Sequence, residues 1–257
     1  MLVWPEKQAL IMKTRNPDQI LNVVPSAKTF SVKGQPLVAI PHKTNETVML
    51  RNLGYDAPAP IRSYYNWSGR FTPFHAQKEA AAFLSMNTRA FNLSELGTGK
   101  SLASLWAYDY LKSVGQLNKV LVISPLSTLE RTWADELFNH FPHLTFGVLH
   151  GTKDKRIKLL KEDFDVYIIS HDGVGIIEPH MRKRSDIDLV IVDEIAQCAR
   201  NAGTTRWKNI NTVVNRHTEP RSCWAMSGTP TPNSPTDAWA QCRLVSPQSV
   251  PPYFNRF

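Results

Sequence analysis

The strongest chemical signal in the sequence is a glycine-rich turn followed by a lysine and a hydroxyl residue, Glu95-Leu-Gly-Thr-Gly-Lys-Ser101. Gly97 and Gly99 let the backbone curl so that successive amide groups point at phosphate oxygens. Lys100 can reach the outer phosphates of a nucleotide, and the hydroxyl of Ser101 can hold Mg²⁺. The turn therefore predicts a phosphate-binding site.

A helix has to follow this turn if backbone amides are to face a bound phosphate. Residues 101–112 carry apolar side chains at helical spacing, and Gly115 suits the end of that helix. The N-terminus of such a helix favours negative charge. The strict motif has glycine where this chain has Ser94, so a chance glycine turn remains the alternative for this segment taken alone.

Two adjacent carboxylates, Asp193 and Glu194, follow an apolar run at 189–192. One carboxylate can hold Mg²⁺ and the other can polarise an attacking water, which is the positioning and charge neutralisation that phosphoryl transfer needs. An acidic cap on the next helix is the alternative. The glycine turn elsewhere in the chain favours the catalytic interpretation.

Four short apolar runs are predicted to be the strands that position these groups. A run that is apolar throughout is typical of a strand covered on both faces, as in a parallel sheet with crossover helices. Ligands bind outside the carboxyl ends of such strands, and each run is followed there by a small polar or acidic residue. The runs are 120–123, 166–169, 189–192 and 223–226, followed by Ser124, Ser170, Asp193 and Ser227.

The first 70 residues have a different texture. Short apolar runs alternate with two predicted helices: the runs are 9–12 and 37–40, and the helices are 18–24 and 45–53. The prolines of Ala57-Pro-Ala-Pro60 interrupt any ladder or helix. We therefore predict a small α+β accessory domain at 1–70 and a second, α/β domain at 71–257.

Composition limits the classes of function. Of 257 residues, 42% are hydrophobic and 20% charged, which excludes disordered, collagen-like and coiled-coil proteins. The chain has no apolar run of membrane-spanning length and no secretion signal, so we expect an intracellular protein, cytoplasmic or nucleoid-associated, without a membrane partner. Three scattered cysteines predict neither disulfides nor a zinc site.

The net charge of +8 suits a polyanionic partner. The excess is concentrated near the N-terminus, where the first 70 residues hold nine basic and four acidic side chains. This makes the accessory domain a candidate for nucleic-acid contact.

Six segments, in this order, resemble the motifs of the Swi/Snf-like ATPases of helicase superfamily two, of a bacterial or phage type. They are Phe71-Thr-Pro-Phe-His-Ala-Gln77, Glu95–Ser101, Val120–Ser127 with Trp133, Tyr167–His171, Val190–Glu194 and Met226–Asn233. The resemblance covers residues 71–257. It implies a RecA-like P-loop lobe with a mostly parallel sheet, ATP and Mg²⁺ as cofactors, and double-stranded DNA as a partner.

The resemblance also implies a role for individual residues. Adenine recognition falls to Gln77, and phosphate binding to Glu95, Gly97, Thr98, Gly99, Lys100 and Ser101. Metal binding falls to Ser101 and Asp193, and catalysis to Lys100, Asp193 and Glu194. Coupling of nucleotide state to DNA falls to Ser227, Gly228 and Thr229. Contacts with the DNA phosphate backbone, which read no sequence, fall to Ser124, Pro125, Ser127, Ser170 and Asn233.

Some residues depart from the family pattern. Ala196 stands where the family has a histidine that links this motif to the third one, so we expect the coupling to run through a different residue. Ala76 replaces the usual aromatic residue before Gln77. The second RecA-like lobe, with its arginine finger, does not follow within these 257 residues. We expect that lobe as a partner in cis or in trans, and little hydrolysis without it.

The leading hypothesis is the ATP-binding motor lobe of a DNA-dependent ATPase that translocates on double-stranded DNA and remodels protein–DNA complexes. The alternative is a non-catalytic module that kept the lobe to bind DNA or a partner, and ATP turnover distinguishes the two. The segment Ser227-Gly-Thr-Pro230 disfavours a small-molecule kinase, which does not require it.

Other residues give weaker signals. Trp133, Trp224 and Trp239 are predicted to be core aromatics. Residues 62–70 mix arginines with aromatics and could grip nucleic acid, although a linker packed on the ATPase lobe is the favoured interpretation. The basic run 181–184 is predicted to be a solvated loop. The histidines show no metal-ligand spacing: His140, His143, His150 and His171.

Overall fold

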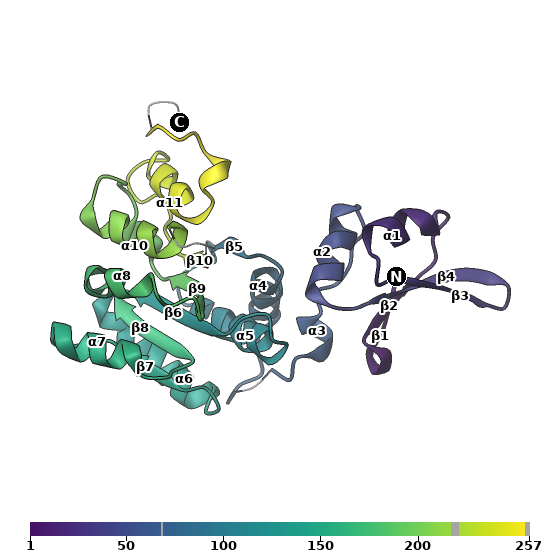
Figure 1. Ribbon diagram of the computed structural model, residues 1–257, viewed down its shortest axis with the longest axis horizontal. Helices are drawn as coiled ribbons and strands as arrows, with labels where there is room; N and C mark the ends of the chain where they lie inside the picture. Colours follow the sequence, from purple (N-terminus) through teal and green to yellow (C-terminus); the bar gives the residue numbers. More distant parts are fainter. Residues whose placement is uncertain (68, 217–220, 255–257) are drawn as a thin grey trace. The chain divides into compact units, whose positions relative to one another are not determined.

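The computed structural model describes residues 1–67, 69–216 and 221–254. It divides into two units, Met1–Asn66 and Trp67–Phe257 (Figure 1), and each is described here by itself. Ser68, which belongs to the aromatic and basic segment 62–70, lies outside the described residues.

The first unit is an antiparallel sheet with helices. Its strand order is β1-β2-β4-β3, with β1 at Leu2–Trp4, β2 at Ala9–Met12, β3 at Lys28–Val32 and β4 at Gln35–Pro41. Its helices are α1 at Pro17–Val23, α2 at Thr44–Asn52 and α3 at Ile61–Tyr64. The predicted helices are confirmed to within one residue. Strands β1 and β3 were not predicted, because β1 is only three residues long and is followed at once by Pro5, and β3 is mostly polar and exposed.

The second unit is built on a six-stranded, all-parallel sheet in the order β5-β10-β9-β6-β8-β7. Its strands are β5 at Arg89–Asn92, β6 at Lys119–Ser124, β7 at Phe146–Val148, β8 at Val166–Ser170, β9 at Ile187–Val192 and β10 at Ser222–Met226. The four predicted strands are confirmed as β6, β8, β9 and β10. Strands β5 and β7 were not predicted, because both are short and partly exposed.

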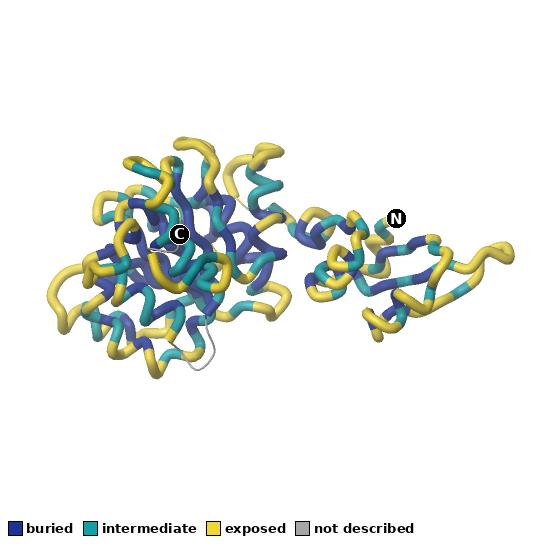
Figure 2. The backbone as a smooth tube through the Cα atoms, turned by 90° about the horizontal axis from the view of Figure 1, so that it is seen from above, coloured by how far each residue is buried: buried dark blue, intermediate teal, exposed yellow. Residues whose placement is uncertain are grey.

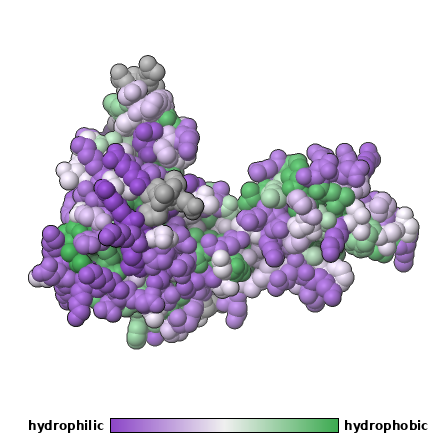
Figure 3. Space-filling view, viewed as in Figure 1, coloured by the Kyte–Doolittle hydropathy of each residue, from purple (hydrophilic) through white to green (hydrophobic). Residues whose placement is uncertain are grey.

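Helices cover both faces of this sheet. They are α4 at His75–Ser85, α5 at Lys100–Ser113, α6 at Asp135–His140, α7 at Lys153–Lys161, α8 at Val174–Met181, α9 at Ile195–Cys198, α10 at Thr205–Asn215 and α11 at Asp237–Val245. None of the helices in the described ranges is long and apolar enough to cross a membrane. The side of this unit turned toward the viewer in Figure 3 is mostly hydrophilic.

Alternate residues of each strand face opposite layers of helices. Leu121, Tyr167 and Val190 pack with α7, α8 and α10 on one face. On the other face the hydroxyl of Ser104 in α5 donates to the sulfur of Met226, at 3.0 Å. The buried segments therefore gather along the strands, as Figure 2 shows in dark blue.

The predicted core role is confirmed for two of the three tryptophans. Trp133 and Trp224 are buried, with exposed fractions of 0% and 1%. Trp239 is only half-buried, because its ring lines a surface cavity and meets the edge of Phe254.

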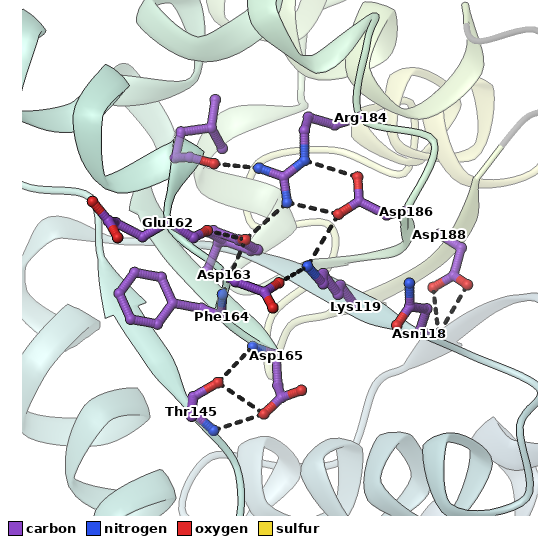
Figure 4. A network of polar contacts seen from close by, with 12 residues as sticks. Asn118, Lys119, Thr145, Glu162, Asp163, Phe164, Asp165, Arg184, Asp186 and Asp188 are labelled. Atoms are coloured by element: carbon purple, nitrogen blue, oxygen red, sulfur yellow. Dashed lines mark hydrogen bonds and ion pairs between the residues drawn. The ribbon is translucent and has the colours of Figure 1, made fainter.

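The amino ends of the central strands are tied together by an ionic network (Figure 4). Lys119, which begins β6, pairs with Asp163 ahead of β8 and with Asp186 ahead of β9. Arg184 donates to Asp186 at 2.8 Å and lies over the ring of Tyr167. The prediction of a solvated basic loop is therefore wrong for Arg184, which is held by a neighbouring carboxylate and ring.

Candidate active site

The glycine-rich turn lies between the carboxyl end of β5 and the start of α5. Gly97 and Gly99 have φ of +77° and +78°, in the region that favours glycine. Lys100 is the first residue of α5 and is buried; its Nζ donates to the carbonyl oxygens of Ser94 and Glu95, at 3.0 and 2.9 Å. The ammonium group therefore occupies the turn, where it is poised to exchange carbonyl partners for phosphate oxygens.

Gln77, the residue proposed for adenine, contacts the glycine-rich turn directly. Its Nε2 donates to the carbonyl of Thr98 at 3.2 Å, and its Oε1 accepts from the amide of Phe74 at the start of α4. A Cβ atom on Gly99 would come within 2.3 Å of the Gln77 Nε2. Only glycine fits there without displacing this side chain, so Gln77 and the turn are packed as one unit.

Ser94 replaces the first glycine of the strict motif without disrupting the turn. Its amide and hydroxyl both donate to Oδ1 of Asn92, at 3.2 and 2.7 Å. The hydroxyl of Thr98 closes the other side of the turn by donating to the carbonyl of Glu95, at 2.7 Å. Side-chain hydrogen bonds of this kind stabilise turns locally.

Asp193 and Glu194 follow β9 at the same edge of the sheet. Asp193 is 7% exposed, and its carboxylate accepts from the indole Nε1 of Trp133 and from the amide of Glu194, both at 3.0 Å. Burial raises the pKa of Asp193, while the bond from Trp133 opposes that rise. This carboxylate is held in one orientation, as a metal ligand has to be.

The third motif is joined directly to Glu194. The hydroxyl of Ser227, at the end of β10, donates to Oε2 of Glu194 at 3.3 Å and accepts from the amide of Thr229 at 3.2 Å. A Cβ atom on Gly228 would lie 2.8 Å from the side chain of Leu96 in the glycine-rich turn. Residues 227 and 228, predicted to couple nucleotide state to DNA, therefore contact both Glu194 and the glycine-rich turn, although Ala196 stands where the family has its linking histidine.

Two residues near the acidic pair were not predicted as functional. His171 was set aside because it lacks metal-ligand spacing, yet its Nε2 donates to the carbonyl of Asp193 at 2.8 Å. Its place at the end of the motif Tyr167–His171 was the available signal. Glu136 has a buried Oε2 that meets no hydrogen-bond partner among the described residues, and burial together with the charge of Asp193 raises its pKa to about 7. Nothing local in the sequence marked Glu136.

The residues proposed to touch DNA lie at the carboxyl edge of the sheet, on strand ends and on the loops that follow them. Ser124 and Ser170 are paired in register on β6 and β8, and both are buried. Ser170 caps the next turn by accepting from the amide of Gly173. Pro125 is half-buried and Ser127 is exposed. Ser127 is therefore the hydroxyl of this group that a phosphate can reach directly.

Asn233 lies on the loop after β10, apart from those serines in the sheet order. It lines an open cavity of about 760 Å³, together with Arg200 and Trp239. Its backbone amide donates to Asp237 at the start of α11, at 3.1 Å. The residues predicted to bind nucleotide thus lie close together, whereas those predicted to contact DNA are spread along the edge of the sheet.

The residues at this edge fit Mg²⁺ and a nucleoside triphosphate. The described residues contain no group of three or more His, Cys, Asp or Glu side chains able to hold a metal by themselves. Mg²⁺ in nucleotide sites needs only one or two protein oxygens, because phosphates and water supply the rest. Half-exposed Ser101 and the oriented carboxylate of Asp193 are suitable donors.

Comparisons with known proteins agree with this arrangement. The profile of the SNF2-related domain matches residues 76–253. The ISWI chromatin-remodeling complex ATPase ISW2 of Saccharomyces cerevisiae is 30% identical over 159 residues, which are 60% of this chain and 14% of that protein. The chromatin-remodeling ATPase INO80 of Aspergillus terreus is 28% identical over 166 residues, 60% of this chain and 9% of that protein. The chain thus spans a small part of these relatives.

Solved structures show the same fold. The Sulfolobus solfataricus SWI2/SNF2 ATPase core in complex with dsDNA matches with a TM-score of 0.62 and 22% identity, over 74% of this chain and 39% of that chain. The six-stranded parallel sheet is therefore a RecA-like lobe, as the motifs predicted. Since the domain profile spans well over half of the sequence, this chain belongs to the SNF2-related domain family.

Proposed function

We propose that residues 67–257 are the ATP-binding motor lobe of a DNA-dependent ATPase that moves along double-stranded DNA and remodels protein–DNA complexes. The observation that carries the proposal is the contact of Ser227 and Gly228 with Glu194 and with the glycine-rich turn. A loop that touches both groups can pass a change at the phosphate site to the DNA-facing edge of the sheet.

Each residue of the site has a distinct part in this proposal. Lys100 leaves the carbonyls of the turn for the outer phosphates, and Ser101 with Asp193 holds the metal. Bound Mg²⁺ would neutralise charge on the phosphates. Glu194 orients and polarises the attacking water, and the hydroxyl of Ser227 positions its carboxylate.

The DNA partner and the need for a second lobe rest on the family. The relatives' names describe chromatin-remodeling ATPases, and one solved core is bound to dsDNA. We propose that this chain shares that reaction class, with Ser127 and Asn233 contacting DNA phosphates. We propose further that a second RecA-like lobe, in cis or in trans, closes over the nucleotide and supplies an arginine.

The phosphate site is tested by Lys100→Ala. We expect the variant to lose measurable binding of Mg²⁺-ATP in isothermal calorimetry while keeping its circular dichroism spectrum, because no other cation replaces the contact from the helix start. The matched control is Lys158→Ala, an exposed lysine on α7. Equal affinity of Lys100→Ala and wild type for ATP would refute the site.

ATP turnover distinguishes the motor lobe from the alternative function, a non-catalytic DNA- or partner-binding module. A motor lobe gains DNA-stimulated hydrolysis when the second lobe is supplied, whereas a binding module gains none. If the chain hydrolysed ATP well by itself, the arginine would have to come from within it. Arg206 already pairs with Asp172 and Arg243 donates to the carbonyl of Pro247, so Arg200 would be tested first.

A further inference from the structure

The antiparallel sheet of the first unit is covered by helices on one face only. Leu10, Val38 and Ile40 point to that face and are buried with Ile20 of α1 and Leu50 of α2. Figure 1 shows α1 and α2 on the same side of this sheet. Because side chains alternate along a strand, the neighbouring positions must point to the opposite face.

This opposite face, called the open face here, is rich in apolar and aromatic side chains. Leu2 and Trp4 of β1 and Val32 of β3 are 67%, 43% and 47% exposed. The half-buried side chains of Ile11, Phe30 and Leu37 lie between them in register. A surface of this kind on a small unit marks a binding site rather than a plain solvated face.

The charge on the open face is purely basic. Lys28 lies two residues before Phe30 on β3 and so points to the same face. Lys13 directly follows β2 on that side, and its Nζ donates to the Gln35 side chain at 3.3 Å. None of the four strands, all of which lie within the described residues, contains an aspartate or glutamate. The face therefore combines exposed rings with positive charge and carries no carboxylate on its strands.

We propose that the open face binds single-stranded DNA, with bases stacked on Trp4 and Phe30 and phosphates held by Lys13 and Lys28. The two rings lie on the two edge strands, three strand spacings apart across the sheet and four residues apart along it, which is about 20 Å at ordinary sheet dimensions, so they would hold separate bases of one strand. Stacking needs bases that are free of a partner strand. A four-stranded sheet is wider than the two-stranded ribbon that a major groove admits, and a duplex would present mainly phosphates to it.

This inference extends the proposed nucleic-acid role of residues 1–70 and names its ligand. Binding of single-stranded DNA to the open face does not require ATP at Lys100, so an experiment can contradict this proposal without contradicting the proposed ATPase function. Lys100→Ala should lose ATP binding and leave binding of single-stranded DNA unchanged.

The experiment is fluorescence anisotropy with the full chain and a labelled oligothymidylate, against a duplex of the same length. We expect the double variant Trp4→Ala and Phe30→Ala to weaken binding of the single strand by at least about tenfold, since stacked rings are worth that much. Duplex affinity should stay within about twofold, because phosphate contacts supply it. Trp4→Phe should retain most of the affinity, because it keeps a stacking ring.

Controls come from the helical side of the same unit. Val23→Ala and Met49→Ala remove exposed apolar side chains from α1 and α2 and should change nothing. Lys28→Ala should lower the slope of log affinity against log salt by about 0.7, the value for one phosphate contact with a single strand. Lys43→Ala, at the start of α2, should leave that slope unchanged.

Three results would overturn the proposal. One is an unchanged affinity of the folded double variant for oligothymidylate, with folding checked by circular dichroism. Another is an equal loss of single-strand and duplex binding. The third is a change from dimer to monomer in sedimentation without any change in DNA binding, which would make the open face an interface between copies of the chain.

Discussion

At the residue scale, the site is organised around one buried carboxylate. Asp193 accepts from an indole and an amide, while its carbonyl accepts from His171. Buried polar groups need such partners, because an unsatisfied one costs about 1–3 kcal/mol. Trp133 is therefore both a core residue and the group that orients the carboxylate proposed to bind Mg²⁺.

Glu136 is an exception, because its buried Oε2 has no hydrogen-bond partner among the described residues, and the effect of its titration on stability can be measured. Its pKa is raised from 4.5 to about 7, mainly by burial. Stability from the protonated form is complete below the unfolded pKa and is lost as pH rises through about 7. Without nucleotide, Glu136→Gln should therefore be more stable than wild type at pH 8, by up to about 3 kcal/mol, with the gap closing toward acid pH.

Thermal unfolding of both proteins between pH 5 and 8.5 checks this prediction. Glu130→Gln, an exposed neighbour on the same helical segment, is the control and should follow wild type at every pH. Parallel curves for Glu136→Gln and wild type would show that the carboxyl stays ionised in the folded protein.

At the element scale, the two ends of the parallel strands have different tasks. The glycine-rich turn, Asp193 with Glu194, and residues 227–229 all lie at the carboxyl ends. The amino ends carry Lys119 and Arg184, paired with Asp163 and Asp186 in the network of Figure 4. Lys119 joins segments that are distant in sequence, whereas Arg184 and Asp186 are two residues apart, so the network holds the starts of β6, β8 and β9 together rather than any single helix.

Asp186 is the carboxylate shared by both cations of that network. The bond from Arg184 lowers its pKa to about 2. Its contribution to stability is present above the ordinary aspartate pKa and is lost as pH falls toward 2. Asp186→Asn should cost about 1 kcal/mol at pH 7, a figure reduced for the solvent exposure of the carboxylate, and almost nothing near pH 2.

Urea unfolding at the two pH values measures this difference. Glu162→Gln is the control, because its exposed side chain lies at the same edge of the sheet. An equal loss for Asp186→Asn at both pH values would mean that the ion pairs are not what stabilises this edge.

At the scale of the whole molecule, the prediction concerns turnover. The proposal assigns the arginine to a second lobe, and in GTPases an arginine supplied in trans is worth about 10³–10⁵ in rate. The 257-residue chain by itself should therefore hydrolyse ATP near the background rate, with weak duplex binding that falls steeply with salt. Supplying the second lobe should restore DNA-stimulated hydrolysis, which Glu194→Gln should abolish while keeping ATP binding.

A coupled ATPase assay with and without duplex DNA decides this point. Robust stimulated turnover by the isolated chain would contradict the need for a second lobe. Turnover of Glu194→Gln at the wild-type rate, in the two-lobe form, would assign the catalytic base to another residue.

From the sequence alone, the parallel sheet and its four central strands could be predicted, and the residues proposed to bind nucleotide could be named. These signals are local: continuous apolar runs, a glycine turn and an acidic pair each carry their meaning in a few neighbouring residues. The short edge strands β5 and β7 carry no such pattern, because their assignment depends on pairing with β10 and β8.

Contacts between side chains that are distant in sequence are seen only in the folded chain. Trp133 reaches Asp193 across 60 positions of sequence, and Ser227 reaches Glu194 across 33. Arg184, part of a basic run in the sequence, lies over the ring of Tyr167, 17 positions away, once the chain is folded. The open face of the first unit likewise forms only when the four strands pair and α1 and α2 pack on the same side of the sheet. Such contacts join distant segments, so no local pattern of residue types encodes them.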